Sequence, residues 1–232
     1  MGVDMTKWQE IAKANVHNRP AGEGRLAGKI TIVTGAAQGF GKGIAEELYA
    51  EGATIVVADM NLPLAETVAK EMGERAWAIA VNVSDEESCA NMVAQVVEKF
   101  GGLDIMVANA GVVRSGPIAS FEKKDFDFVT AINYTGLFLT CKYAAIIMQA
   151  QHEANPEEMY DIIAMSSKSG LEGSNKNFLS EGIKNSIPVT RNRGRRNTKT
   201  LRLFSKRRDR RKRRRNGRRK RKNAGYGKKK KN

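Results

Sequence analysis

Five short apolar runs alternate with helical segments between residues 30 and 165, and this alternation constrains the fold more than any other feature. The runs carry few charges, and the segments between them repeat apolar residues at spacings of three and four. Apolar strands separated by amphipathic helices are typical of a parallel sheet covered on both faces. The sequence therefore predicts an α/β fold with a doubly wound parallel sheet. The predicted strands are 30–33, 54–58, 76–81, 105–108 and 161–165.

Local signals predict where several helices begin and end. Ser84 with Glu87 three positions later forms a capping box, which predicts a helix from there to Phe100. A long apolar helix is expected over 126–151. A further short helix is expected around 8–15, in the segment that precedes the first strand.

Charge divides the chain into two parts. Residues 1–177 carry 15 Lys and Arg against 23 Asp and Glu, whereas residues 178–232 carry 25 against 2. A segment so basic and so poor in apolar residues cannot bury enough surface to offset the entropy of ordering, so a disordered tail is expected. The predicted organisation is an extension over 1–28, a folded domain over 29–177 and a basic tail over 178–232.

The remaining composition excludes several classes of protein. Cys89 and Cys141 form no CxxC or Cys/His pattern, so neither a disulfide framework nor a metal site is predicted. The first residues lack the unbroken apolar run of a secretory signal, and no stretch is expected to reach the apolar length of a membrane span. We therefore expect a cytoplasmic protein with no membrane partner.

A glycine-rich loop directly follows the first predicted strand. It runs from Thr34 to Gly41 with the letters TGAAQGFG and opens the next helix. Glycines let the backbone turn tightly and approach a pyrophosphate, while the helix N-terminus supplies N–H groups and the positive end of the helix dipole. A tight turn with no ligand would have the same letters, so the interpretation depends on further residues.

An acidic residue at the end of the second strand supports a dinucleotide. Asp59 lies eighteen residues after Gly41, where a carboxylate can accept hydrogen bonds from the adenosine ribose hydroxyls. The same carboxylate would repel a 2′-phosphate, and neither Gln38 nor Met60 is a basic residue that could attract one. NAD is therefore the expected cofactor, in preference to NADP.

Two further motifs lie at the carboxyl ends of predicted strands. Asn82-Val83 follows the third strand, and Asn109-Ala110-Gly111 follows the fourth. Ligands bind at this edge in open α/β sheets. The expected cofactor-binding residues are Gly35, Gln38, Gly39, Phe40, Gly41, Asp59, Asn82, Val83, Asn109, Ala110 and Gly111.

Together these motifs resemble those of the short-chain dehydrogenase/reductase family over roughly residues 25–177. The family's TGxxxGxG matches residues 34–41, with Phe40 where an aliphatic residue is usual. Its Asp-Val adenine contact matches Asn82-Val83, whose amide is expected to hydrogen-bond an adenine amino group. Its NNAG matches residues 108–111 without the first Asn. The resemblance implies a Rossmann-type, NAD-dependent oxidoreductase that interconverts an alcohol and a ketone by hydride transfer.

The resemblance also implies catalytic positions. Asn133 matches a helix Asn that holds a water in the family's proton relay, and Ser167 matches the Ser that hydrogen-bonds the substrate oxygen. A satisfied helix Asn and a strand-end hydroxyl are the plainer interpretations of the same two residues. The letters SSKSG over 166–170 are most similar to polyol or sugar-alcohol dehydrogenases, which points to a polyol substrate.

The family's catalytic Tyr has no counterpart at its usual place. That Tyr stands thirteen residues after the Ser, with a Lys four residues further on, and here these positions hold Ser180 and Lys184. An aliphatic hydroxyl is shorter than a phenol and has a far higher pKa, so it cannot serve as the acid and base. Tyr226 precedes a lysine run in a YxxxK pattern, but any Tyr before such a run would match. Lys184 stays a candidate catalytic residue, and impaired turnover is expected.

Two functions remain open from the sequence. One is an NAD-dependent alcohol–ketone oxidoreductase with little turnover, which would form a homo-oligomer if the family's subunit-contacting helix were intact. The other is a non-catalytic dinucleotide-binding protein whose basic tail binds nucleic acid without sequence preference, through the phosphates. The abrupt change in composition also fits a shift of reading frame, which sequencing of the transcript across the codons for 173–191 tests.

Overall fold

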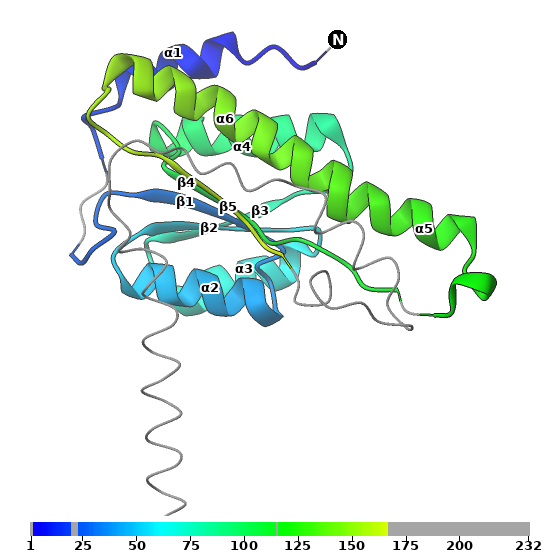
Figure 1. Ribbon diagram of the computed structural model, residues 1–232. Coiled ribbons are helices and arrows are strands. Elements are labelled where there is room, and N and C mark those ends of the chain that lie inside the picture. The colour runs from blue at the N-terminus through cyan, green and yellow to red at the C-terminus, as the bar shows by residue number, and fades with distance from the viewer. Residues whose placement is uncertain (1, 20–22, 115, 167–232) are drawn as a thin grey trace, which may run out of the picture. The chain divides into compact units, whose positions relative to one another are not determined.

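Figure 1 shows a computed structural model of the chain, which describes residues 2–19, 23–114 and 116–166. The predicted doubly wound parallel sheet is confirmed: five parallel strands lie in the order β3-β2-β1-β4-β5. The expected basic tail, together with Ser167 and Lys184, lies outside the described residues. The strands are β1 (Ile30–Thr34), β2 (Thr54–Asp59), β3 (Ala76–Ala80), β4 (Ile105–Ala108) and β5 (Asp161–Ala164).

The order of the strands along the sheet reverses at β1, which lies in the sheet centre. Residues 30–34 pair with 54–58 on one side, and residues 31–33 pair with 105–107 on the other. Such a reversal opens a crevice at the carboxyl ends of the strands, which is where ligands bind in sheets of this type. The glycine loop follows β1 directly and therefore begins at this crevice.

Helices cover both faces of the sheet. α2 (Gly39–Ala50) and α3 (Leu62–Met72) lie on one face, and α4 (Glu86–Phe100) and α6 (Gly136–Ala154) lie on the other (Figure 1). The two layers explain why the strands are apolar throughout, because both faces of each strand are buried.

Successive residues of the central strands enter opposite cores. Val33 and Val57 belong to the apolar cluster that includes residues of α2 and α3. Ile32 and Val56 belong to the second cluster, which includes residues of α4 and α6. All five residues of β1 are buried, so this strand forms the centre of the domain.

One long helical stretch, Lys123–Ala154, combines three elements. α5 (Lys123–Thr130) passes through a π-helical turn, η2 (Ala131–Thr135), into α6. The stretch is longer at both ends than the predicted helix over 126–151, and the π turn interrupts it. A short 3-10 helix, η1 (Ile118–Ser120), precedes it.

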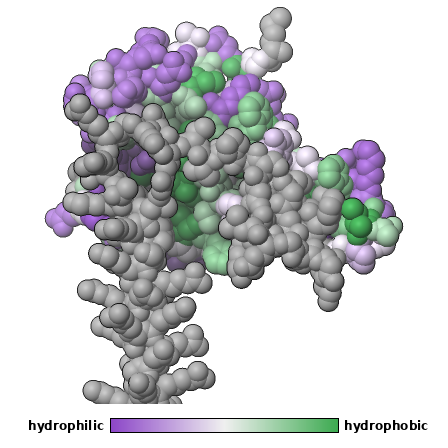
Figure 2. Space-filling view, in the orientation of Figure 1, coloured by the Kyte–Doolittle hydropathy of each residue, from purple (hydrophilic) through white to green (hydrophobic). Residues whose placement is uncertain are grey.

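The expectation that no stretch reaches the apolar length of a membrane span is wrong for Lys123–Ala154. By length and composition this stretch could cross a membrane, yet 44% of its most apolar window is buried inside the protein. Its C-terminal part, α6, packs on the sheet, on α4 and on α1 (Thr6–Ala14), so contacts on several sides account for its apolar character. Where the stretch begins, apolar side chains reach the surface, as the colouring of the α5 end in Figure 2 shows. The exposed aromatic residues of the stretch are Phe126, Phe128, Tyr134 and Phe138.

The extension before β1 belongs to the domain. The expected short helix is confirmed as α1, which packs against α4 and α6. Met5 and Ala12 belong to the apolar cluster that includes residues of α4 and α6. The sequence predicts the helix but not its partners, because an apolar face does not identify the surface that covers it.

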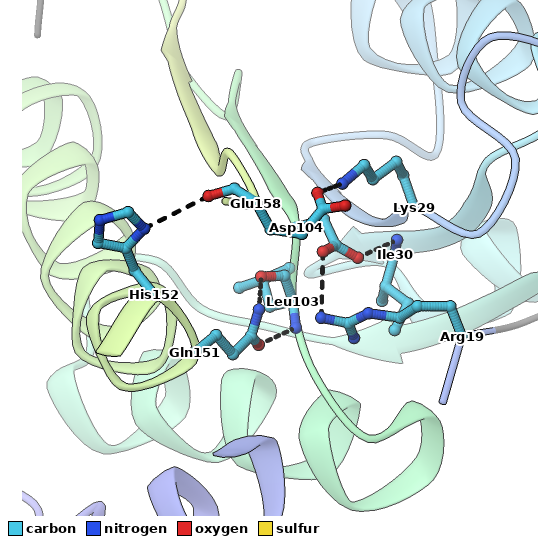
Figure 3. A network of polar contacts seen from close by, with 8 residues as sticks. All are labelled: Arg19, Lys29, Ile30, Leu103, Asp104, Gln151, His152 and Glu158. Carbon is cyan, nitrogen blue, oxygen red and sulfur yellow. Dashed lines mark hydrogen bonds and ion pairs between the residues drawn. The ribbon is translucent and has the colours of Figure 1, made fainter. Parts of the chain in front are cut away.

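A polar network ties the extension to the amino edge of the sheet (Figure 3). The Asp104 carboxylate accepts a hydrogen bond from the N–H of Ile30 at 2.8 Å and pairs with Arg19 at 3.2 Å. Burial raises the pKa of Asp104 above its ordinary value, and the charge of Arg19 opposes this rise. The Gln151 side chain bonds both backbone groups of Leu103. The extension, β1, β4 and α6 are thus joined at the edge opposite the glycine loop.

The predicted capping box is wrong by one residue. The N-cap of α4 is Asp85, whose carboxylate accepts a hydrogen bond from the N–H of Ser88 at 2.7 Å. Ser84 instead donates its backbone N–H and its hydroxyl to the side chain of Asn82. The error arises because Ser and Asp are both good caps, and adjacent candidates cannot be ranked from the letters alone.

Candidate cofactor site

The glycine loop passes from β1 into α2 in a conformation that requires glycine. Gly35 and Gly39 have φ angles of 65° and 60°, in the left-handed region that glycine adopts without a steric penalty. A Cβ on Gly41 would collide with the carbonyl oxygen of Gly35, and a Cβ on Gly35 would lie 2.9 Å from the Cα of Ala110. The loop therefore packs directly against the end of β4.

The first turn of α2 carries backbone donors that the helix itself does not use. Its N-cap, Gln38, makes no side-chain cap, and the turn holds no acidic residue. N–H groups in the first turn of a helix have no intrahelical acceptor, and with the positive end of the dipole they suit a pyrophosphate. Phe40 lies in this turn with 88% of its surface exposed.

Asp59 ends β2 beside the loop and is held by two backbone groups. One carboxylate oxygen accepts a hydrogen bond from the N–H of Ala37 at 3.1 Å, and the other accepts one from Asn61 at 3.0 Å. An ionised carboxylate has about four acceptor positions. Asp59 is therefore oriented by the fold and still has lone pairs for ribose hydroxyls.

Asn82 lies one strand further out. Val81 donates its N–H to the carbonyl of Asp59 at 3.0 Å, which sets the end of β3 next to the end of β2. The Asn82 Oδ1 accepts the backbone N–H of Ser84 at 3.1 Å and the Ser84 hydroxyl at 2.7 Å. An amide oxygen has two lone pairs, and both are in use. The amide NH₂ is the group of Asn82 that remains, and the expected contact with an adenine amino group stays a prediction.

Asn109 holds the glycine loop in place. Its Nδ2 donates to the carbonyl oxygens of Thr34 at 2.9 Å and Gly35 at 3.2 Å. The backbone N–H groups of Asn109 and Ala110 both donate to the buried Thr34 hydroxyl at 3.1 Å. Thr34 is thus a supporting residue that the sequence reasoning used only as the start of a motif. Its signal was a hydroxyl at the end of the strand, directly before the glycine loop.

Asn133 lies in the π turn, buried, and fixes the chain that follows β4. Its side chain accepts the N–H of Val112 and donates to the Val112 carbonyl, both at 2.8 Å. The side chain is therefore that of a satisfied helix Asn, and its part in a proton relay stays a prediction.

Gly136, which the sequence reasoning did not single out, lets α6 approach the end of β3. A Cβ there would lie 2.8 Å from Val83 Cγ2. A single Gly inside a helical pattern was the signal that could have identified it, since such a residue often has a packing reason.

The described residues fit a dinucleotide at one edge of the sheet. The glycine loop after β1, the carboxylate at the end of β2 and the amide after β3 lie in this order along the edge of the sheet. The pyrophosphate, ribose and base of a dinucleotide follow one another in the same order. Ala110, Gly111 and Val83 follow β4 and β3 at the same edge. Ser167 and Lys184 lie outside the described residues, so their roles stay predictions.

Two cysteines lie within the described part and neither is activated. Burial raises the pKa of Cys89 to about 12 and that of Cys141 to about 11. The Cys89 thiol donates a hydrogen bond to the carbonyl of Val83 at 3.4 Å. A thiol with a raised pKa is a poor nucleophile, so thiolate chemistry has no support at this edge.

Known proteins share these features. The family model for short chain dehydrogenases matches residues 29–179. The chain is 36% identical to a sorbitol dehydrogenase of Cereibacter sphaeroides over 149 residues, which cover 64% of this chain and 56% of that protein. It is 34% identical to a galactitol 2-dehydrogenase of Agrobacterium fabrum, with the same 64% and 56% covered. The chain thus spans little more than half the length of these relatives.

A solved structure has the same fold. A 3-ketoacyl-(acyl-carrier-protein) reductase from Brucella melitensis, complexed with NADH, matches with a TM-score of 0.66 and 29% identity. The match covers 69% of this chain and 66% of that one. Members of the family use NAD or NADP, in agreement with the fit of the glycine loop and Asp59. From the family model, the relatives and the fold together, this chain belongs to the short chain dehydrogenase family.

Proposed function

We propose that this chain binds NAD in preference to NADP, at a site that serves the interconversion of a polyol-type alcohol and a ketone. The observation that carries the cofactor preference is Asp59, whose carboxylate is fixed by Ala37 and Asn61 at the end of β2. A fixed negative charge there accepts hydrogen bonds from ribose hydroxyls and repels a 2′-phosphate.

Within the part of the chain that the structure describes, no Lys or Arg forms an ion pair with Asp59. Gln38 and Met60 flank the site and are uncharged and exposed. Lys42, one residue beyond the glycine loop, pairs with Glu71 at 2.8 Å and with Glu46 at 3.9 Å. Since its charge is compensated on α2 and α3, it is poorly placed to attract a phosphate to the ribose.

Each residue of the site then has a definite task. The N–H groups of the first turn of α2 bind the pyrophosphate, and Asp59 orients the ribose. Thr34 and Asn109 hold the loop against β4, and Asn133 fixes the segment around Val112, which follows β4. When bound, the nicotinamide ring accepts or donates the hydride.

The substrate class and the rate are proposed from the sequence and the relatives. The SSKSG letters and the likeness to sorbitol and galactitol dehydrogenases favour a polyol, with Ser167 bonding its oxygen. Position 180 holds Ser where the family has its phenolic acid and base. We therefore propose dinucleotide binding with little turnover.

Calorimetric titration of the full chain with NADH and NADPH tests the cofactor preference. We expect NADH to bind at least about tenfold more tightly than NADPH, because a hydrogen bond to a charged group contributes about 1.5–3 kcal/mol. Asp59→Asn removes the charge, keeps one acceptor and should reduce the preference. Asp85→Asn, a matched change at the start of α4, should leave it unchanged.

Two outcomes would contradict the proposal, one for the cofactor and one for turnover. Equal or tighter binding of NADPH by the parent chain would overturn the assignment of NAD. NADH absorbance with sorbitol and galactitol tests turnover, which should be barely measurable. Brisk turnover would show that the missing phenol is replaced by another group.

A further inference from the structure

We infer that the free edge of β3 pairs with β3 of a second copy of this chain, so that the two sheets join antiparallel about a two-fold axis. Such a pair concerns assembly, which the proposed function leaves open. The backbone of β3, its side chains and the charges of the two helices beside it each support this occupant.

Alternate residues of β3 turn their backbone groups away from the sheet. β3 pairs with β2 and is an outer strand of the sheet that the described residues form. The carbonyl of Arg75 accepts a hydrogen bond from β2 at 2.7 Å, and the N–H of Val81 donates one to β2 at 3.0 Å. In a parallel ladder every second residue faces the same neighbour. The residues whose backbone groups face away from β2 are therefore Ala76, Ala78 and Ala80.

β3 lacks the features by which proteins usually protect an outer strand. Its letters are AWAIA, with no charge and no Pro, and its pairing with β2 runs without a bulge. Edges are commonly blunted by such features, because unpaired N–H and C=O groups bind a further strand. The N–H of Ala76 donates to the carbonyl of Gly73 at 3.0 Å. The outward groups of Ala78 and Ala80 remain for a partner strand.

A second copy supplies a matching edge. When two β3 strands run antiparallel about an axis near Ala78, Ala78 faces its own copy and Ala76 faces Ala80 of the other chain. Facing residues whose backbone groups point outward exchange hydrogen bonds in such a pair. One patch thus serves both copies, as in two-fold dimers generally. The small alanine side chains let the second strand and its helices approach closely.

The helix on one face of this edge carries complementary charges. Glu66 and Lys70 lie about one turn apart on α3 and line an open groove of about 260 Å³ beside residues 76–78 of β3. Both side chains are exposed, and within the described part of the chain neither forms an ion pair. A two-fold axis reverses the order of the charges, so Glu66 of one copy faces Lys70 of the other. Opposite charges across an interface favour this partner and this direction of pairing.

The helix on the other face has the same arrangement. Glu87 of α4 lines a cavity with Ala80, at the carboxyl end of β3. Lys99 lies over the ring of Trp77 at 5.2 Å, toward the amino end of β3. An antiparallel pair sets the amino end of one strand beside the carboxyl end of the other, so Lys99 lies toward Glu87 of the second copy. A parallel pair would instead bring like charges together on both faces.

Sedimentation velocity of the full chain at physiological salt, from about 1 μM to about 200 μM, measures the dimer. Lys70→Glu should raise the dissociation constant at least about fivefold, because two facing pairs become repulsive. Glu66→Lys should do the same. The chain with both changes should return to within about threefold of the parent value, because the two charges have exchanged places. Lys124→Glu makes the same charge change on α5, away from this edge, and should have no effect.

Ala78→Pro tests the backbone contacts. Pro is accepted in an outer strand where the N–H faces away from the sheet, but it offers no N–H to a partner strand. We expect a folded monomer whose dissociation constant rises at least about tenfold. Circular dichroism and thermal unfolding establish that the variant is folded, and the charge variants leave the backbone unchanged.

The inference is overturned if the parent chain stays monomeric over the whole range of concentrations. It is also overturned if a dimer forms whose dissociation constant ignores Lys70→Glu and Glu66→Lys, or if the chain with both changes stays as weak as the single variants. A dimer that responds to Lys124→Glu in place of Lys70→Glu assembles through α5, which likewise excludes the edge of β3.

Discussion

α2 and α4 start at the same edge of the sheet, and their first turns are built in opposite ways. α4 is capped by Asp85 and has Glu86 and Glu87 in its first turn. α2 follows Gln38, which makes no side-chain cap, and its first turn has no acidic residue. Both helices present the positive end of a dipole, but only α4 neutralises it with its own side chains.

The comparison distinguishes a helix N-terminus that is capped for stability from one whose N–H groups remain open for a ligand. In α4 a carboxylate uses a backbone N–H and stabilises the fold, as caps generally do by about 1 kcal/mol. In α2 the corresponding donors stay open next to Asp59, and glycines keep side chains away from them. The chain thus gives up capping stability at the position where an anionic ligand can supply the missing acceptors.

The largest expected effect comes from adding a side chain in the uncapped first turn of α2. Gly41→Ala places a methyl group against the carbonyl oxygen of Gly35 and 2.6 Å from Asn109 Nδ2. Overpacking of this kind costs about 1–3 kcal/mol, and the displaced loop should lose at least about tenfold in NADH affinity. Thermal unfolding and calorimetric titration measure the two effects.

Gly43→Ala is the matched control on the same helix. A Cβ at Gly43 meets no atom within 4 Å, so Ala should stabilise α2 by about 0.5–1 kcal/mol through helix propensity and leave NADH affinity unchanged. If both Ala variants bound NADH like the parent chain, the close packing of the loop would not matter for the ligand.

A smaller effect is expected from removing the N-cap of α4. Asp85→Ala removes the acceptor of the Ser88 N–H, which should lower the free energy of unfolding by about 1 kcal/mol. NADH affinity should stay within about twofold of the parent value, because α4 uses this cap for folding. Urea unfolding with and without NADH separates the two quantities. A tenfold loss of affinity at constant stability would show that the start of α4 also binds the ligand.

The smallest effect concerns the pH dependence of α4. Hydrogen bonds from Lys142 and Tyr143 hold the pKa of Glu86 below its ordinary value of 4.5. A lowered pKa in the folded state adds stability above the unfolded value, and this is lost as the pH falls through the folded value. Glu86→Gln should therefore flatten the stability profile below about pH 4.5, measured by thermal unfolding.

Glu87→Gln supplies the comparison for this prediction, since it removes a charge from the same turn at an exposed position. It should keep the acid slope that Glu86→Gln removes. Equal profiles for the two variants would mean that the contacts of Glu86 do not contribute.

The sheet and most elements could be predicted because their signals are local. Apolar runs and helical spacing identify strands and helices from neighbouring residues, and the glycine loop and Asp59 fall at strand ends that those runs define. The errors involve choices between contacts. Either Ser84 or Asp85 could cap α4 by residue type, and the structure has Asp85 there. Asn133, in the π turn, forms a hydrogen bond with Val112, which lies 21 residues away in the sequence.

The sequence by itself determined the parallel α/β fold, the position of the glycine loop and the acidic residue after β2, since periodicity and composition carry these. Only the tertiary structure decided that α1 covers α6, that Asn109 supports the loop through Thr34 and that Asn82 keeps its oxygen on Ser84. The physical reason is that a hydrogen bond or a packing contact is set by which groups meet in space. The direction in which an amide points depends on partners that the order of letters does not reveal.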